Sequence, residues 1–253
     1  MKRAALLLAA PLLTAQASAP TLVPDVSQRA VEIAYSFTGA ELLLFGAILY
    51  PGGRTPRGSR RTDIVVVVKG PTQSIRVREK QRVAGIWVNA EDLRYRSAPS
   101  FYAVASSRPI AQIVDERTRA IYELGLDSLQ LSPASSAAPN VQDRFAQGLV
   151  ELRRRTGLYY EDPDAVEITG GVLYRARVAI PARVPVGRFT AETFLIRDGR
   201  VLAAAVREID IRKSGFERFV AQAAEQASLL YGLIAVALSV GLGWFAGWVA
   251  GRR

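Results

Sequence analysis

The sequence predicts a mainly β protein: an immunoglobulin-like β-sandwich with a helical insertion at about 109–160, followed by a C-terminal transmembrane helix. Short β-branched and aromatic runs separated by Gly, Pro and Asn are typical of antiparallel strands. After Pro109 the apolar residues recur at helical spacing. The stretch 227–251 contains no charged residue, as a membrane span requires. Two separate lobes are the alternative to one sandwich.

The strand-like runs occur on both sides of the helical insertion. Residues 188–196 and 201–211 flank Asp198-Gly199, a dipeptide typical of a two-residue hairpin turn. In 172–180 apolar residues alternate with Arg175 and Arg177, which predicts a strand with one buried face. The runs before the insertion are residues 31–37, 41–50, 63–69, 74–79, 83–89 and 101–105.

Two helices are predicted within the insertion. Apolar residues from Ile110 to Leu124 have helical spacing and stop at Gly125. After a low-complexity bridge, a second helix is expected to begin at Asn140 as N-cap and to end at Gly157 in the C′ position. Its apolar stripe comprises Val141, Phe145, Leu149 and Leu152.

The two ends of the sequence predict how the chain meets a membrane. Lys2 and Arg3, an apolar segment and then small residues are typical of a signal peptide, predicted as 1–17 with cleavage after Ala17 or Ala19. The body, 18–213, is then periplasmic, and the chain belongs in a bacterial inner membrane. A capping-box spacing predicts a juxtamembrane helix at 214–226, before the transmembrane helix 227–251 and a cytoplasmic tail 252–253. Basic residues flank the span on both sides, so the signal peptide decides the orientation.

Composition excludes several kinds of chemistry. The chain has no histidine and no cysteine, which excludes Ser-His-Asp and Cys-His nucleophiles, thiolate or imidazole zinc sites and disulfides. The net charge is +10, a balance that favours anionic lipid headgroups or acidic partners. Most of the basic residues are arginine, a bias that also arises in GC-rich genomes, so the charge is a weak signal.

A stripe of small residues is the sharpest candidate site. Four-residue spacing places its members on one face of the anchor, where another helix can approach closely. The partner is either a second copy or a different protein, and a simple anchor is the alternative interpretation. The stripe consists of Ala235, Ser239, Gly243, Gly247 and Gly251.

Two charged clusters offer alternatives. A Gly- and Pro-rich loop carries guanidinium groups that suit phosphate, sulfate or lipid headgroups, or that are simply solvated. These residues are Arg54, Arg57, Arg60 and Arg61. A run of carboxylates near residue 163 suits calcium or acid–base chemistry, although a polar turn explains it equally well. Its members are Glu161, Asp162, Asp164 and Glu167.

Several strings resemble a known family. Residues 37–48, 83–90, 99–109, 184–187 and 197–199 are similar to the alphaproteobacterial "putative transmembrane protein" family, whose members are single-pass with a periplasmic body. The resemblance covers nearly the whole chain after the signal peptide. It transfers no catalytic, cofactor or metal-binding residue. It implies a partner, because members are similar to accessory proteins that accompany a permease of the sulfite-exporter type.

The residues of these strings have structural interpretations. Gly39, Gly46 and Gly85 suit turns or bulges. Trp87, Phe101 and Tyr102 are expected in the core. The segment from Ser106 to Arg108 leads into the first helix, and a serine there acts as a nucleophile only if the fold brings Lys69 or Lys80 close to it.

We therefore expect a non-enzymatic, membrane-anchored periplasmic protein that acts as an accessory or interaction subunit. Its expected partners are the bilayer and either a polytopic permease or a second copy, with no nucleic acid, cofactor or metal. One alternative is a periplasmic module that binds an oxyanion or anionic lipid headgroup through the arginine loop. A second alternative is a hydrolase that uses Glu161 or Asp162.

Overall fold

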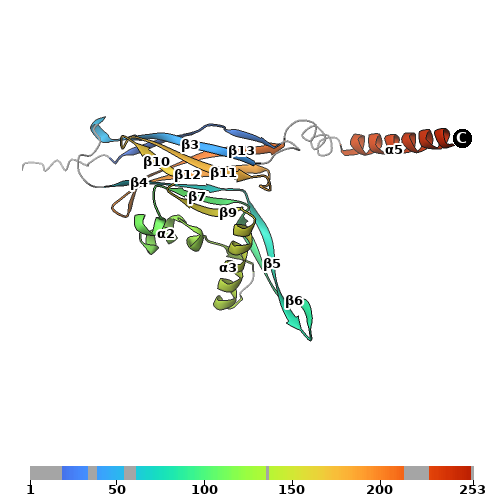
Figure 1. The fold of residues 1–253 in the computed structure, drawn as a ribbon, viewed down its shortest axis with the longest axis horizontal. Coiled ribbons are helices and arrows are strands. Elements are labelled where there is room, and N and C mark those ends of the chain that lie inside the picture. The colour runs from blue at the N-terminus through green and yellow to red at the C-terminus, as the bar shows by residue number, and fades with distance from the viewer. Residues whose placement is uncertain (1–18, 34–38, 54–60, 135–136, 214–227, 252–253) are drawn as a thin grey trace, which may run out of the picture.

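The computed structural model describes residues 19–33, 39–53, 61–134, 137–213 and 228–251. The predicted signal peptide 1–17, juxtamembrane helix 214–226 and tail 252–253 lie outside the described residues. Strands dominate the body, one helical insertion interrupts them, and a helix follows them at the C-terminal end (Figure 1). The prediction of a mainly β fold with these additions is confirmed. The immunoglobulin-like type of the sandwich stays a prediction.

One layer of the body is a four-stranded antiparallel sheet. Its inward residues follow the predicted alternation, since Tyr174 and Val178 are buried while Arg175 and Arg177 are exposed. The strand order is β1 (Thr21–Val26), β3 (Gly39–Leu49), β11 (Leu173–Pro181) and β10 (Val166–Thr169). The predicted strands 41–50 and 172–180 thus pair directly with each other.

The second layer is a six-stranded sheet that packs face to face on the first. Buried residues from both sheets form one hydrophobic core. The Asp198-Gly199 turn, with φ of 51° and 76°, joins its β12 and β13, as predicted. The order is β2 (Ala30–Ile33), β13 (Arg200–Lys213), β12 (Gly187–Arg197), β4 (Thr62–Lys69), β7 (Tyr102–Ser106) and β9 (Tyr159–Pro163). Two neighbouring pairs, β2 with β13 and β7 with β9, are parallel.

The helical insertion covers the outer face of this second sheet (Figure 1). Strand β4 is therefore buried on both faces, and its run of four valines, Val65 to Val68, has no polar alternation. The insertion comprises α1 (Ile110–Ile113), α2 (Glu116–Tyr122), the 3₁₀ turn η2 (Leu126–Ser128) and α3 (Pro139–Arg155). A second 3₁₀ turn, η1 (Pro51–Gly53), follows β3.

The predicted helices differ from the observed ones in detail. The single helix expected over 110–124 is two short helices, because Asp115 caps α2 by accepting a hydrogen bond from the Thr118 N–H at 2.9 Å. Helix α3 has Ala138 rather than Asn140 as N-cap, while Gly157, with φ of 70°, has the predicted C′ role. Phe145 and Leu149 of the predicted stripe are buried, and Leu152 is exposed.

The third sheet is a long ribbon that extends away from the sandwich (Figure 1). It consists of β5 (Thr72–Val83), β6 (Ile86–Pro99) and the short β8 (Ser132–Pro133). The turn between β5 and β6 is Ala84-Gly85, with φ of 48° and 88°, so the strand predicted at 83–89 is interrupted by a hairpin turn. Phe101 and Tyr102 are core aromatics as predicted, but the prediction for Trp87 is wrong, because its side chain is exposed beside this turn.

Candidate functional site

Helix α5 (Ser228–Ala250) carries the predicted docking stripe. A four-residue repeat advances by about 40° more than one helical turn, so successive members adjoin and the stripe winds slowly around the helix. At Gly243 and Gly247 an added Cβ would meet no atom within 4 Å other than the neighbouring backbone of the helix itself. The Ser239 hydroxyl donates to the Ala235 carbonyl at 2.8 Å, so this polar group is satisfied inside the helix. Gly251 follows the helix, and its N–H donates to the Gly247 carbonyl at 2.9 Å.

The composition of α5 fits a membrane span. Among the described residues, one helix is long and apolar enough to cross a bilayer: its stretch Tyr231–Trp248 has a mean hydropathy of 1.5, and none of it is buried by the rest of the protein. Its exposed aromatics include Tyr231 near one end and Trp244 and Trp248 near the other. Such a distribution suits the two interfaces of a membrane.

The arginine loop lies mostly outside the described residues. Arg54, Arg57 and Arg60 fall in the undescribed segment, and Arg61 is an exposed residue directly before β4. The anion site predicted there stays a prediction.

The four predicted carboxylates are divided between two concavities. Glu161 and Asp162 are neighbours in β9, so their side chains point to opposite faces. Glu161 accepts a hydrogen bond from the Leu126 N–H and lines a cavity of about 210 Å³ under the helical insertion. Asp162, Asp164 and Glu167 line a different cavity, of about 340 Å³. Glu161 and Asp162 therefore do not form a carboxylate pair.

The calcium interpretation of the same cluster finds no support in the geometry. The Glu167 carboxylate accepts a hydrogen bond from the Arg175 guanidinium at 2.7 Å, so a cation already neutralises it. Within the described residues, no group of three or more acidic side chains has an arrangement that suits a metal ion.

The Ser-Lys arrangement also depends on strand register. In the ladder between β4 and β7, Ser106 lies opposite Val65, whereas Lys69 lies opposite Tyr102. Four ladder positions separate the serine from the lysine, which is about 13 Å along the strand. The fold does not bring Lys69 within hydrogen-bonding distance of Ser106.

The segment that leads into α1 is fixed by a buried aspartate of β4, which supports its structural interpretation. Arg108 donates to the two Asp63 carboxylate oxygens at 2.9 and 2.7 Å, and Ser107 donates to the same carboxylate at 2.9 Å. Hydrogen bonding to this carboxylate raises the pKa of Arg108 above its ordinary value. The bidentate pair thus holds the chain where it leaves the sheet.

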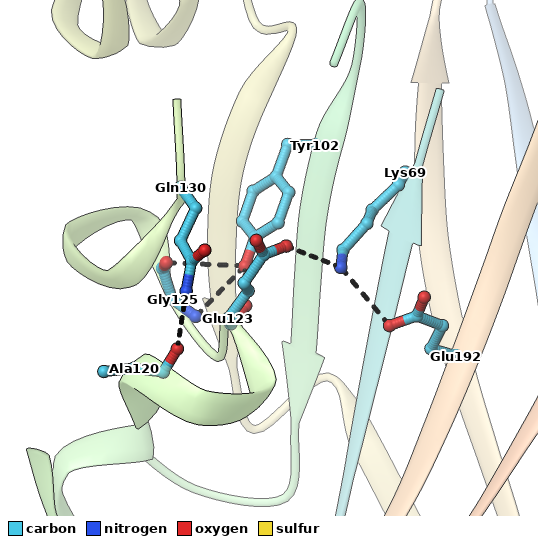
Figure 2. Close-up of polar contacts among 7 residues, drawn as sticks. All are labelled: Lys69, Tyr102, Ala120, Glu123, Gly125, Gln130 and Glu192. Carbon is cyan, nitrogen blue, oxygen red and sulfur yellow. Dashed lines mark hydrogen bonds and ion pairs between the residues drawn. The ribbon is translucent and has the colours of Figure 1, made fainter. Parts of the chain in front are cut away.

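A second polar network joins the insertion to the sheet (Figure 2). Lys69, the last residue of β4, donates to the Glu123 carboxylate at 2.8 Å, and its ammonium lies 3.3 Å from the Glu192 carboxylate of β12. Glu123 follows α2 in a left-handed conformation, with φ of 51°, which turns the chain toward the sheet. The three side chains are remote in sequence, so no local pattern predicts their meeting.

Tyr102 fixes the backbone of the turn that carries Glu123. Its hydroxyl donates to the Glu123 carbonyl and accepts a hydrogen bond from the Gly125 N–H at 3.1 Å. Burial raises the pKa of Tyr102 well above its ordinary value, so the phenol stays neutral and keeps its proton for this bond. Gln130 adds a hydrogen bond to the Ala120 carbonyl at 3.2 Å. The αL turn after α2 is thus held from both sides (Figure 2).

The charges of this network suit structure better than proton transfer. Burial by itself lowers the pKa of Lys69, but its hydrogen bonds and charge interactions with Glu123 and Glu192 outweigh that effect and raise the pKa. A lysine that acts as a general base needs a lowered pKa. Lys69 is therefore an ammonium at neutral pH, and it ties α2 to β4 and β12.

The fold and the exposed helix define a class: a β-rich body followed by a single candidate membrane span. The comparisons with known proteins place the chain within that class. The family model described as "Putative transmembrane protein" matches residues 21–252, and the chain belongs to this family. A search of curated proteins finds no match.

Proposed function

We propose that the protein is a membrane-anchored, non-enzymatic interaction subunit of the bacterial inner membrane. Its α5 docks on a helix of another membrane protein, and its β-rich body contacts envelope partners in the periplasm. A polytopic permease is the proposed partner in the membrane.

The stripe of small residues on the unburied α5 is the observation that carries this proposal. At Gly243 and Gly247 nothing in the described protein occupies the space beside the helix backbone. Small residues let two backbones approach closely, and in lipid this packing drives helix association. Because the Ser239 hydroxyl donates its hydrogen bond within the helix, a partner helix need not supply an acceptor for it.

Mild-detergent purification of the full chain from its native membrane, with mass spectrometry of the proteins that accompany it, tests the docking. The test variant is Gly243→Leu with Gly247→Leu, which fills the stripe with side chains that a bilayer accepts. The matched control is Ala237→Leu with Gly241→Leu, because at about 100° per residue Gly241 lies about 160° and Ala237 about 120° around the helix from Gly243. The control sites are equally exposed.

We expect a polytopic protein to accompany the wild type and the control and to be lost from the stripe variant. Recovery of a second copy instead, again lost from the stripe variant, retains the docking and replaces the permease by self-association. Association that survives in the stripe variant contradicts docking through this face.

A further inference from the structure

The end of the β5–β6 ribbon is an exposed apolar surface that the proposed function does not use. We call residues 80–90 the hairpin tip. Every residue of the hairpin tip is exposed, on both faces of the ribbon. The ribbon carries the hairpin tip away from the sandwich and beyond the end of α3 (Figure 1).

The base of the same ribbon is covered, which sets the hairpin tip apart. Val77, Leu93 and Tyr95 form a small core with Phe145 and Leu149 of α3. The Tyr95 hydroxyl donates to the Gln142 carbonyl at 3.3 Å, which fixes α3 on the ribbon. Arg144 of α3 contacts Glu79 and Glu91, the residues directly before and after the hairpin tip, and the hairpin tip itself is exposed.

The hairpin tip exposes four large apolar side chains. Ile86 and Trp87, directly after the turn, are 68% and 66% exposed, and Val83 and Val88 are exposed beside them. Cross-strand pairing places Val83 opposite Ile86, so apolar residues occur together on one face as well as around the turn. A two-stranded ribbon with both faces in water is only marginally stable. Clustered exposed apolar residues mark an interaction surface.

The charge of the hairpin tip has one sign. Its charged residues are Lys80 and Arg82, and Arg82 pairs across the strands with Trp87. The nearest acidic residues are already paired: Arg144 of α3 contacts Glu79 at 3.2 Å and also Glu91, and Arg76 contacts Asp92 at 3.1 Å. The hairpin tip therefore combines an apolar end with two cations that no carboxylate of the ribbon base neutralises.

We propose that the hairpin tip inserts into the interface of a bilayer that contains anionic lipids. Tryptophan is enriched at the headgroup level of membranes, and lysine and arginine near the surface are attracted by anionic lipids. The apolar residues around the turn enter the acyl boundary, while Lys80 and Arg82 remain at the phosphates. The chain belongs to a transmembrane family, so a bilayer is an expected neighbour of the hairpin tip. The insertion does not depend on docking of α5 to a partner.

The fluorescence of Trp87 in the reconstituted full chain tests this proposal. The chain has three tryptophans, so Trp244→Phe with Trp248→Phe leaves Trp87 as the reporter. This protein is placed in vesicles of phosphatidylcholine brominated on its acyl chains, with or without phosphatidylglycerol. We expect a blue-shifted emission that the bromines quench, and stronger quenching when phosphatidylglycerol is present.

Charge reversal in the hairpin tip separates this site from the net charge of the body. Lys80→Glu with Arg82→Glu should abolish the dependence on phosphatidylglycerol. Arg117→Glu with Arg183→Glu makes the same change of charge at exposed positions elsewhere and should leave the quenching intact. The substituted side chains in the hairpin tip are exposed, and circular dichroism should confirm that the fold is unchanged.

Trp87 that remains accessible to acrylamide and unquenched by bromine in every vesicle overturns the proposal. Protection of Trp87 in native membranes but not in lipid vesicles also overturns it and identifies a protein as the cover. Quenching of Trp87 should persist in a background with Gly243→Leu and Gly247→Leu, because insertion does not require helix docking. Trp87 quenching therefore tests the insertion, and co-purification tests the docking.

Discussion

At the scale of single residues, Gly46 lies where two neighbouring strands leave no space for a side chain. A Cβ at this position would lie 2.4 Å from the Val23 carbonyl oxygen and 2.7 Å from the Tyr174 hydroxyl. Gly85 has the predicted turn role. The turn or bulge predicted at Gly46 is wrong, because Gly46 sits in the regular ladder of β3, where it permits a close approach of the neighbouring strands. The sequence pattern identifies the glycine, but it does not show whether a turn or a close approach of strands requires it.

Substitution by alanine should have opposite effects on stability at Gly46, which is closely packed, and at Gly148, which is open. Gly46→Ala forces a backbone shift and should lower the free energy of unfolding by about 1–3 kcal/mol. Gly148→Ala, in the open interior of α3, should raise it by up to about 1 kcal/mol, because alanine is the better helix former. Denaturant unfolding of the full chain in detergent, followed by circular dichroism, measures both. Equal effects of the two substitutions would refute the assignment of Gly46 to close packing.

Trp87 shows why the residue type alone does not predict whether a side chain is buried. An aromatic residue in a β-branched run usually belongs to a core, and Phe101 and Tyr102 follow that rule with no exposed surface. The consecutive apolar residues Ile86, Trp87 and Val88 break the alternation of a half-buried strand, which is the signal that both faces share one environment. The sequence does not reveal that this environment is solvent, because the extent of α3 along the ribbon decides it.

At the scale of elements, Lys69 joins α2 to the two central strands of the larger sheet. Lys69→Gln removes the ammonium and leaves Glu123 and Glu192 without their shared partner. We expect a loss of about 1.5–3 kcal/mol of unfolding free energy at neutral pH. Lys80→Gln makes the same change at an exposed position and should have little effect.

The pH dependence of that loss gives a second test. The pKa of Lys69 is raised in the folded protein, so its stabilising contribution is complete below the ordinary lysine pKa of about 10.4 and is lost as pH rises through the folded value. The difference between wild type and Lys69→Gln should be constant from about pH 7 to pH 10 and should shrink above that range. Both proteins retain the same buried tyrosines, so their titration cancels. A difference that shrinks below pH 10 would contradict the raised pKa.

Helices and strands are predicted correctly where a segment has its own sequence pattern. The prediction fails where the position of the segment in the fold determines its structure. The Asp198-Gly199 hairpin and the alternating strand β11 follow from local sequence. Strand β1 escapes prediction because Pro24 argues against a strand, yet β1 is at the edge of its sheet, where proline is tolerated. The short strands β9 and β10 lie in the run of carboxylates that reads as a polar turn.

At the scale of the whole molecule, the sequence predicts the class of fold but not the order of its strands. Strand β3 pairs with β11 across more than half of the chain, and β2 and β13 form a parallel pair. Such non-local pairings depend on how two faces fit, which no window of sequence contains. The same limit applies to the Lys69 network, whereas the stripe on α5 is readable because it lies within one helix.

At the same scale, we expect α5 to anchor the chain in the membrane with the β-rich body outside the cytoplasm. Because the chain contains no cysteine, single cysteines can report the two sides of the membrane without interference. Ala182→Cys places a thiol on an exposed turn of the body, and Arg253→Cys places one after the anchor.

Labelling of intact spheroplasts with a membrane-impermeant maleimide is the most direct measurement. We predict that Ala182→Cys is labelled in intact spheroplasts and that Arg253→Cys is labelled only after lysis. The reverse pattern would place the body in the cytoplasm and contradict the account, and labelling of both cysteines before lysis would show that α5 does not span the membrane.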